Sequence, residues 1–263
     1  MQSIKLKVLD REGHTYLTCA EGERVSLVHT SAYREGDRIA LECCEPGCWC
    51  FVQLEDSLAP ALVYVARREI NYAIPFGQNR IVFSPKAFTG ERHLIRAWLA
   101  SPEEIAARRN LALNPYDQHG DNGFFPHASA NVETRGEAVF AAYNAIDGIY
   151  ENASHGEWPY QSWGINRDPN AAWTLSFGTP VEIDELRVTL RADFPHDSWW
   201  TQGTVVFSDG SEETLSFVKT EQPQSFPIAP RRVEWLTFQK LIKNGDPSPF
   251  PALTQFEAWG KPV

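Results

Sequence analysis

The side chains of this 263-residue chain that are best suited to acid–base or metal chemistry are histidines and aspartates of its second half. Histidine titrates near neutral pH and a carboxylate accepts a proton or binds a cation, so such a set could supply a general acid and base or a metal site. No spacing is diagnostic, because the chain has no HExxH, GxSxG, glycine-rich phosphate loop or CxxC pair. An enzyme is therefore an alternative and not the favoured interpretation. The set comprises Asp117, His119, Asp121, His127, His155, Asp193, His196 and Asp197.

Four of the five cysteines lie in the segment CCEPGCWC, residues 43–50. A thiolate metal site is one interpretation, but structural zinc sites favour two cysteine pairs well apart in sequence. The favoured interpretation is a hairpin, in which IALECC and CWCFVQL form strands joined by a turn at Glu45, Pro46 and Gly47. The cysteines then partly line the hairpin as small apolar side chains.

The first hundred residues have the pattern of short β-strands. In SIKLKVLD, the apolar residues Ile4, Leu6 and Val8 alternate with polar ones, which is typical of a half-buried strand. Similar segments follow at short intervals, separated by turns that contain glycine, and this spacing indicates a small β-sandwich. The segments are RVSLVHT, RIALECC, CWCFVQL, ALVYVARR, NRIVFS and RHLIRAWLA.

A short helix is predicted between the two halves. Ser101 is its N-cap, Pro102 occupies the first helical position, Glu104 completes a capping box, and Asn110 can end it. We therefore expect a first domain at residues 1–100, a helix and linker at residues 101–112, and a second domain at residues 113–263.

Composition and charge narrow the possible functions. Hydrophobic residues make up 43% and charged residues 22%, a balance typical of a globular protein. The net charge of −10 comes entirely from residues 111–263, which carry 10 basic and 20 acidic groups. A nucleic acid is therefore not expected as a partner, whereas a neutral or cationic partner is expected.

The apolar stretches are only strand-sized, so no membrane insertion is expected. The start MQSIKLKVLDREGH does not resemble a signal peptide, which makes the cytoplasm the default location and leaves export by another route open. The oligomeric state stays undetermined.

The second half contains a long, aromatic, turn-rich stretch and then a second set of strands. The order of NLAL, NAIDG, SWG, WTLSFGTPVEIDELRV, SDGS, RRVEWLTF and LTQFEAWG resembles the discoidin domain, also called the coagulation factor V/VIII type C domain, over about residues 110–260. That family belongs to the galactose-binding-like β-sandwiches, and many bacterial members are carbohydrate-binding modules. The resemblance implies a discoidin-like jelly-roll β-sandwich, and hence an all-β chain with one short linking helix.

The resemblance also implies a structural calcium ion. Its ligands here would be Asp147 and Glu257, with carbonyl oxygens from around Ala145, Tyr150 or Asn152. Calcium prefers six to eight hard oxygen ligands and accepts carbonyls from irregular turns. The alternative is that Asp147 caps its own turn and Glu257 pairs with an arginine.

In this family the ligand site lies on loops at one end of the sandwich, and two loops here combine aromatic and hydrogen-bonding side chains. A sugar ring has apolar faces bordered by hydroxyl groups, so a flat aromatic ring can stack on it while polar groups hold its hydroxyls. We expect one of Trp199 and Trp200 to lie outside the core, since neighbouring residues of a strand face opposite sides, and we expect Trp163, Trp173 and Trp259 in the core. The candidate ligand-binding residues are His155, Trp158, Tyr160, Arg167, His196, Asp197, Trp199 and Trp200.

The favoured function is thus non-catalytic binding of a neutral saccharide. A small carbohydrate-active enzyme, either a hydrolase or a lyase, or an accessory subunit of one, is the first alternative. A protein–protein adaptor is the second.

Overall fold

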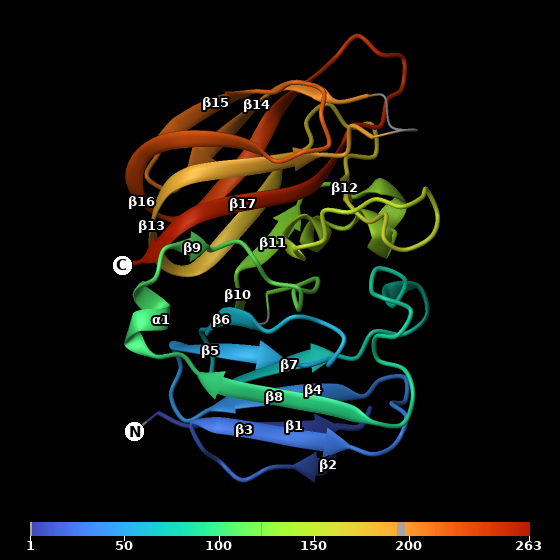
Figure 1. The fold of residues 1–263 in the computed structure, drawn as a ribbon, viewed down its shortest axis with the longest axis vertical. Helices are drawn as coiled ribbons and strands as arrows, with labels where there is room; N and C mark the ends of the chain where they lie inside the picture. The colour runs from blue at the N-terminus through green and yellow to red at the C-terminus, as the bar shows by residue number, and fades with distance from the viewer. Residues whose placement is uncertain (1, 122, 194–197) are drawn as a thin grey trace.

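The N-terminal half is a sandwich of two antiparallel sheets around a single hydrophobic core (Figure 1). The computed structural model describes residues 2–121, 123–193 and 198–263. One sheet has the strand order β2-β1-β4-β7 and the other β10-β6-β5-β8-β3. The strands are β1 Ile4–Leu9, β2 Thr15–Thr18, β3 Arg24–His29, β4 Arg38–Cys43, β5 Cys48–Gln53, β6 Ala61–Val65, β7 Glu69–Ala73, β8 His93–Leu99 and β10 Phe124–Phe125.

Alternation of apolar and polar residues sets these strands, as the sequence predicts. In β1 the side chains of Ile4, Leu6 and Val8 are buried, while Lys5 and Lys7 between them are only partly covered. The predicted hairpin of IALECC and CWCFVQL is wrong. Strands β4 and β5 do not form a hairpin, because β4 pairs with β1 and β7 whereas β5 pairs with β6 and β8 of the other sheet. The turn between them therefore connects the two layers.

The segment NRIVFS is not a strand. Its first residue, Asn79, ends the 3-10 helix η1 (Gly77–Asn79), and the residues after it form turns. Val82 of this segment is buried against Ala138 and Val139 of the second half, so its apolar residues serve a contact between the halves and not a sheet.

The linking helix α1 (Pro102–Ala106) begins as predicted. The Ser101 hydroxyl accepts a hydrogen bond from the Glu104 backbone N–H, and the Glu104 carboxylate accepts one from the Ser101 N–H. The helix is shorter than the sequence suggests. Beyond it the chain is extended in strand β9 (Arg109–Asn110), because this strand pairs with the last strand of the protein.

The C-terminal half is built on one strongly bent antiparallel sheet, with the strand order β12-β17-β13-β16-β14-β15. Two long strands, β13 and β16, run through it with register shifts that let the sheet fold over its own core (Figure 1). Strands β11 and β9 pair with β13 and β17. The remaining elements are β11 His127–Ala130, η2 Thr134–Gly136, η3 Ala138–Phe140, η4 Ala142–Ile146, β12 Trp163–Gly164, β13 Trp173–Leu190, β14 Trp200–Phe207, β15 Glu212–Ser216, β16 Gln224–Lys243 and β17 Ala252–Pro262.

The predicted hairpin around Asp209 and Gly210 is confirmed. Strands β14 and β15 pair, the Asp209 carboxylate accepts from the Ser211 N–H at 2.9 Å, and Gly210 has a φ of 85°. Glycine adopts this left-handed conformation without steric cost, which explains its place in the turn.

Residues 113–121 and 123–126 connect the halves by packing on both. Tyr116 and Phe124 are buried in the N-terminal core, and the side chain of Gln118 makes two hydrogen bonds to the backbone of Ala73. The expected all-β fold is confirmed, with two hydrophobic cores. Among the described residues, no helix has the length and apolar character required to cross a membrane.

Candidate functional site

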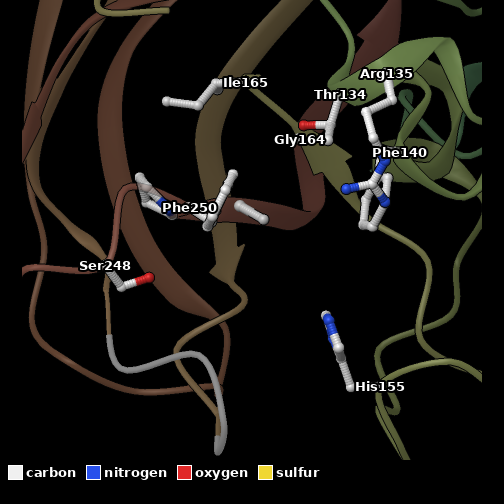
Figure 2. Close-up of a pocket in the computed structure, with 10 residues that line it drawn as sticks. Thr134, Arg135, Phe140, His155, Gly164, Ile165, Ser248 and Phe250 are labelled. Atoms are coloured by element: carbon white, nitrogen blue, oxygen red, sulfur yellow. The ribbon is translucent and has the colours of Figure 1, made fainter. Parts of the chain in front are cut away.

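A pocket of about 250 Å³ lies at one end of the C-terminal sandwich, where the loop before β17 meets the 3-10 helices. We call it the rim pocket. Figure 2 shows Ser248 and Phe250 on one side of an open space, with Phe140 and Arg135 across from them and His155 on a further side. The pocket thus combines aromatic rings with hydrogen-bonding groups. Its lining residues are Thr134, Arg135, Phe140, His155, Gly164, Ile165, Ser248, Phe250, Pro251 and Ala252.

Close packing of β12 against η2 forms the floor of the rim pocket. The hydroxyl oxygen of Thr134 accepts a hydrogen bond from the backbone N–H of Asn166 at 2.9 Å. A Cβ on Gly164 would stand 2.6 Å from that hydroxyl oxygen and 3.3 Å from the Cβ of Phe140. Glycine is therefore required here for the strand to approach the helix.

Arg167 lies against an aromatic wall of the rim pocket. Its guanidinium carbon is 4.6 Å from the centre of the Phe250 ring, within the range of a cation–π contact. Asn166 and Arg167 have φ values of 48° and 64°, a left-handed conformation that is uncommon for arginine. Such conformations are often found at functional sites. Asp168 caps the following turn by accepting from the Asn170 N–H and is not paired with Arg167.

Arg135, the arginine in the lining of the rim pocket, is paired with a neighbouring carboxylate. Its guanidinium donates to both carboxylate oxygens of Glu137, at 2.6 and 2.7 Å, and lies 5.3 Å from the centre of the Phe140 ring. This arginine lowers the pKa of the Glu137 carboxyl. Because Arg135 is neutralised in this way, the pocket has little net charge apart from Arg167.

Arg191, just after β13, holds the loop that carries His155. Its side chain is fully buried and donates hydrogen bonds to the carbonyl oxygens of Tyr160 and, at 3.0 Å, Ser154. Its Nε lies 3.4 Å from a carboxylate oxygen of Asp193. Burial lowers the pKa of Arg191, while Asp193 opposes the shift. A buried arginine therefore fixes both ends of residues 154–160.

The structure buries the two neighbouring tryptophans to different extents. Trp200 is 1% exposed and belongs to the core, with its ring centre 6.2 Å from that of Trp163 and 5.9 Å from that of Phe238. Its inward direction at the start of β14 makes it unavailable for stacking on a ligand. Trp199 is half-buried and packs on the edge of the same core. His196 and Asp197 lie outside the described residues.

Tyr160 and Trp158 are placed away from the rim pocket. The ring of Tyr160 packs on the cluster of Val82, Ala138 and Val139 that joins the two halves. Trp158 lines a larger cavity of about 720 Å³ between the sandwiches, the interdomain cleft. Its indole N–H is buried there without a hydrogen-bond acceptor.

The expected core position of Trp259 is wrong, although Trp163 and Trp173 are fully buried as predicted. Trp259 is half-buried on the wall of the interdomain cleft, and the guanidinium carbons of Arg187 and Arg108 lie 4.4 and 5.4 Å from its ring centre. The chain end is therefore covered by arginines and not by a second apolar layer.

The expected calcium ligands, Asp147 and Glu257, both line the interdomain cleft. The Asp147 carboxylate accepts from the Ile149 N–H at 2.8 Å and from the amide groups of Gln161 and Gln255 at 2.9 and 2.6 Å. The Gln255 amide nitrogen also donates to the carbonyls of Asn144 and Ile149, at 2.9 and 3.2 Å. The Gln255 amide nitrogen thus stands where one carboxylate and two carbonyl oxygens converge, and its two hydrogens can serve two of these three oxygens at a time.

Glu257 has a separate partner. Its carboxylate accepts from the indole N–H of Trp259 at 2.7 Å. Burial raises the pKa of Asp147 to about 7, against the effect of the N–H donors from Gln161, Ile149 and Gln255. As these side chains stand, Asp147 and Glu257 are parts of two hydrogen-bonded groups.

Two histidines of the enzyme alternative, His119 and His127, pair with separate carboxylates. His127 Nδ1 lies 2.8 Å from Asp117, and His119 Nε2 lies 2.8 Å from Glu133. Burial raises the pKa of Asp117, and Asp117 in turn raises the pKa of His127 through a hydrogen bond and its charge, against the effect of burial. These pairs lie outside the rim pocket, whose lining contains His155 but none of the four.

Sequence reasoning missed Phe250, Phe140, Arg135 and Ser248. Phe250 lies between prolines in the segment DPSPFPA. An aromatic residue in a proline-rich loop has few neighbours in sequence to pack on, and this was the available signal.

No protein-family model matches the sequence, and no curated protein does either. Solved structures resemble it in fold. A chitosan-binding module of a chitosanase/glucanase from Paenibacillus sp. IK-5 is 17% identical, over 58% of this chain and 99% of the module, with a TM-score of 0.41. A fucose-binding module from Streptococcus pneumoniae is 13% identical, over 57% of this chain and 96% of the module, with a TM-score of 0.40. The family 32 carbohydrate-binding module of NanJ from C. perfringens, in complex with galactose, is 15% identical, over 50% of this chain and 91% of the module, with a TM-score of 0.39. These structures are carbohydrate-binding modules with a discoidin-like, galactose-binding-like β-sandwich fold, the fold that the sequence resembles.

Proposed function

We propose that this protein binds a neutral saccharide in the rim pocket without transforming it. The observation that carries the proposal is the position of Phe250, an aromatic ring on the wall of an open pocket with Arg167 against it and His155 across from it. An aromatic ring can contact the apolar face of a sugar, while a guanidinium and an imidazole can hydrogen-bond its hydroxyl groups.

The charge distribution favours an uncharged ligand. The Arg135 charge is neutralised by Glu137, and residues 111–263 carry twice as many acidic as basic groups. An acidic sugar would therefore meet one exposed guanidinium, that of Arg167. The net negative charge of residues 111–263 would repel it.

The ligand-positioning parts are attached to rigid elements. Gly164 and Thr134 fix the floor, the turn at Asn166 sets the direction of Arg167, and Arg191 anchors the His155 loop. A preformed site loses less conformational entropy on binding than a mobile one, so a shallow pocket can still give measurable affinity.

The test is a titration of the full chain with galactose, fucose and chitosan oligosaccharides, followed by calorimetry and tryptophan fluorescence. We expect saturable binding of at least one of them, and a loss of about tenfold or more in affinity for Phe250→Ala, which corresponds to about 1.4 kcal/mol. The matched control is Trp158→Ala, which removes an aromatic ring from the interdomain cleft and leaves the rim pocket intact.

The two variants separate the possible sites. Loss of affinity in Trp158→Ala with none in Phe250→Ala would move the ligand to the cleft and overturn the assignment. Product release from the bound glycan would replace the binding function by an enzymatic one. Circular dichroism of both variants must show that the sandwiches remain folded.

A further inference from the structure

The cysteine-rich turn of the N-terminal sandwich brings two thiols into contact across the layers. Cys43 is the last residue of β4 and Cys48 is the first residue of β5, and these strands belong to opposite sheets. Their Sγ atoms are 2.8 Å apart. A bond between the two sulfurs would therefore connect the sheets at one point of the sandwich.

The thiols form a dithiol pair and not a metal centre. Cys43, Cys48 and Cys50 are all buried. Among the described residues, the one cluster of three or more His, Cys, Asp or Glu side chains close enough to hold a metal ion is Asp10, Glu12 and His14, at the surface. Hydrogen bonds from Cys43 and Cys50 lower the pKa of Cys48, and the hydrogen bond to Cys48 together with burial raises the pKa of Cys43. Cys48 is thus the sulfur of the pair that loses its proton more readily.

A surface pocket extends to one residue of this pair, Cys43. An open pocket of about 290 Å³ on the surface has Cys43 in its wall, beside Cys44 and Arg68. Peroxide oxidation of a cysteine depends on access and on thiolate character. Here the pocket reaches Cys43, and the sulfur of Cys48, which loses its proton more readily, lies 2.8 Å from the sulfur of Cys43.

We propose that Cys43 and Cys48 are a redox-active pair that closes to a disulfide when the protein meets a hydroperoxide. The Cys48 thiolate attacks the peroxide, the O–O bond breaks, and Cys48 becomes a sulfenic acid while one oxygen leaves as hydroxide and takes up a proton to form water. The Cys43 sulfur then attacks the Cys48 sulfur and expels the second oxygen as hydroxide, which takes up the Cys43 proton. Two thiols and one hydrogen peroxide thus give one disulfide and two waters.

The test uses the full chain, reduced and freed of reductant, with hydrogen peroxide as the oxidant. After an acid quench the protein is unfolded, free thiols are blocked with one alkylating reagent, disulfides are reduced, and the new thiols are labelled with a second reagent. Tandem mass spectrometry of the tryptic peptide 39–67, which contains four of the cysteines, locates the labels. We expect the second label on Cys43 and Cys48 together, in equal fraction, and an intact mass lower by about 2 Da for the two lost hydrogens.

Two single variants test the pairing. Cys43→Ala should prevent the loss of mass. The control Cys19→Ala removes a half-buried thiol that lies outside residues 43–50, and it should leave the loss of mass unchanged. If Cys43→Ala fails to fold, Cys48→Ala replaces it, and the labelling of the wild type stands independently of both. The second label on Cys44 or Cys50, or its absence from residues 43–50 after oxidation, would overturn the proposal.

Discussion

The anchor of the His155 loop offers the sharpest test of how this structure positions its candidate site. Replacing Arg191 by methionine keeps a long side chain but removes the donors to the Tyr160 and Ser154 carbonyls and the partner of Asp193. A hydrogen bond from a charged donor contributes about 1.5–3 kcal/mol. Breaking a buried ion pair from one side costs about 3–5 kcal/mol, because the remaining charge is left without compensation. We expect Arg191→Met to destabilise the closed loop by about 3–5 kcal/mol.

Hydrogen exchange measures this effect at the loop itself. The Ala153 N–H donates to the Pro159 carbonyl at 3.0 Å, a bond that exists only while the loop is closed. A loss of about 3–5 kcal/mol accelerates exchange of this amide by about two to nearly four orders of magnitude.

The matched control is Arg108→Met. The Arg108 guanidinium also pairs with two carboxylates, Asp184 and Glu185, but its side chain is 45% exposed. A surface pair contributes at most about 1 kcal/mol. Equal effects of the two substitutions, or unchanged exchange at Ala153 in Arg191→Met, would refute the role of the buried guanidinium.

Three further predictions follow from other contacts. Thermal stability should fall as pH rises above about 6.5, because the hydrogen bond and charge of Asp117 raise the pKa of His127, which therefore keeps its proton to a higher pH in the folded than in the unfolded protein. His127→Gln should flatten this pH profile, and an unchanged slope would contradict the assignment. Millimolar calcium or EDTA should leave the melting temperature of the wild type unchanged. Gln255→Glu should create calcium-dependent stabilisation, because it replaces the N–H donor with a carboxylate. A calcium response of the wild type would show that the amide can be displaced. Gly260→Ala should destabilise the second sandwich by about 3 kcal/mol or more in denaturant titration, since its Cβ would stand 1.9 Å from the Glu182 carbonyl oxygen. The control Gly245→Ala, whose Cβ would have no atom within 4 Å, should leave the stability unchanged.

Much of the chain's organisation could be predicted from local pattern. Alternation along β1 and the capping box at Ser101 and Glu104 depend on residues close in sequence, so both could be predicted from the sequence. The segment NRIVFS shows the limit of this reasoning. Val82 is apolar because it contacts Ala138 and Val139, and a partner so far along the chain leaves no periodicity to detect.

The candidate site also has residues that the sequence could predict and residues that it could not. The sequence could place His155 and Arg167 in loops with polar and aromatic neighbours, and both lie at the rim pocket or on its Phe250 wall. It could not find Phe250, which comes from a loop more than eighty residues later, or show that Trp158 faces a different cavity. Loop residues are assembled by the strands that carry them, and that assembly is a long-range property.

The sequence by itself determined the all-β class, the short capped helix between two sets of strands, and the acidic character of the second half, because each follows from composition or from neighbours along the chain. Only the tertiary structure decided which side chains meet. It placed Cys43 and Cys48 of opposite sheets in contact, directed the Gln255 amide toward Asp147, and buried Trp200 while Phe250 lines a pocket. The physical reason is that strand pairing and core packing join distant segments, and the contacts of a side chain are set by those segments.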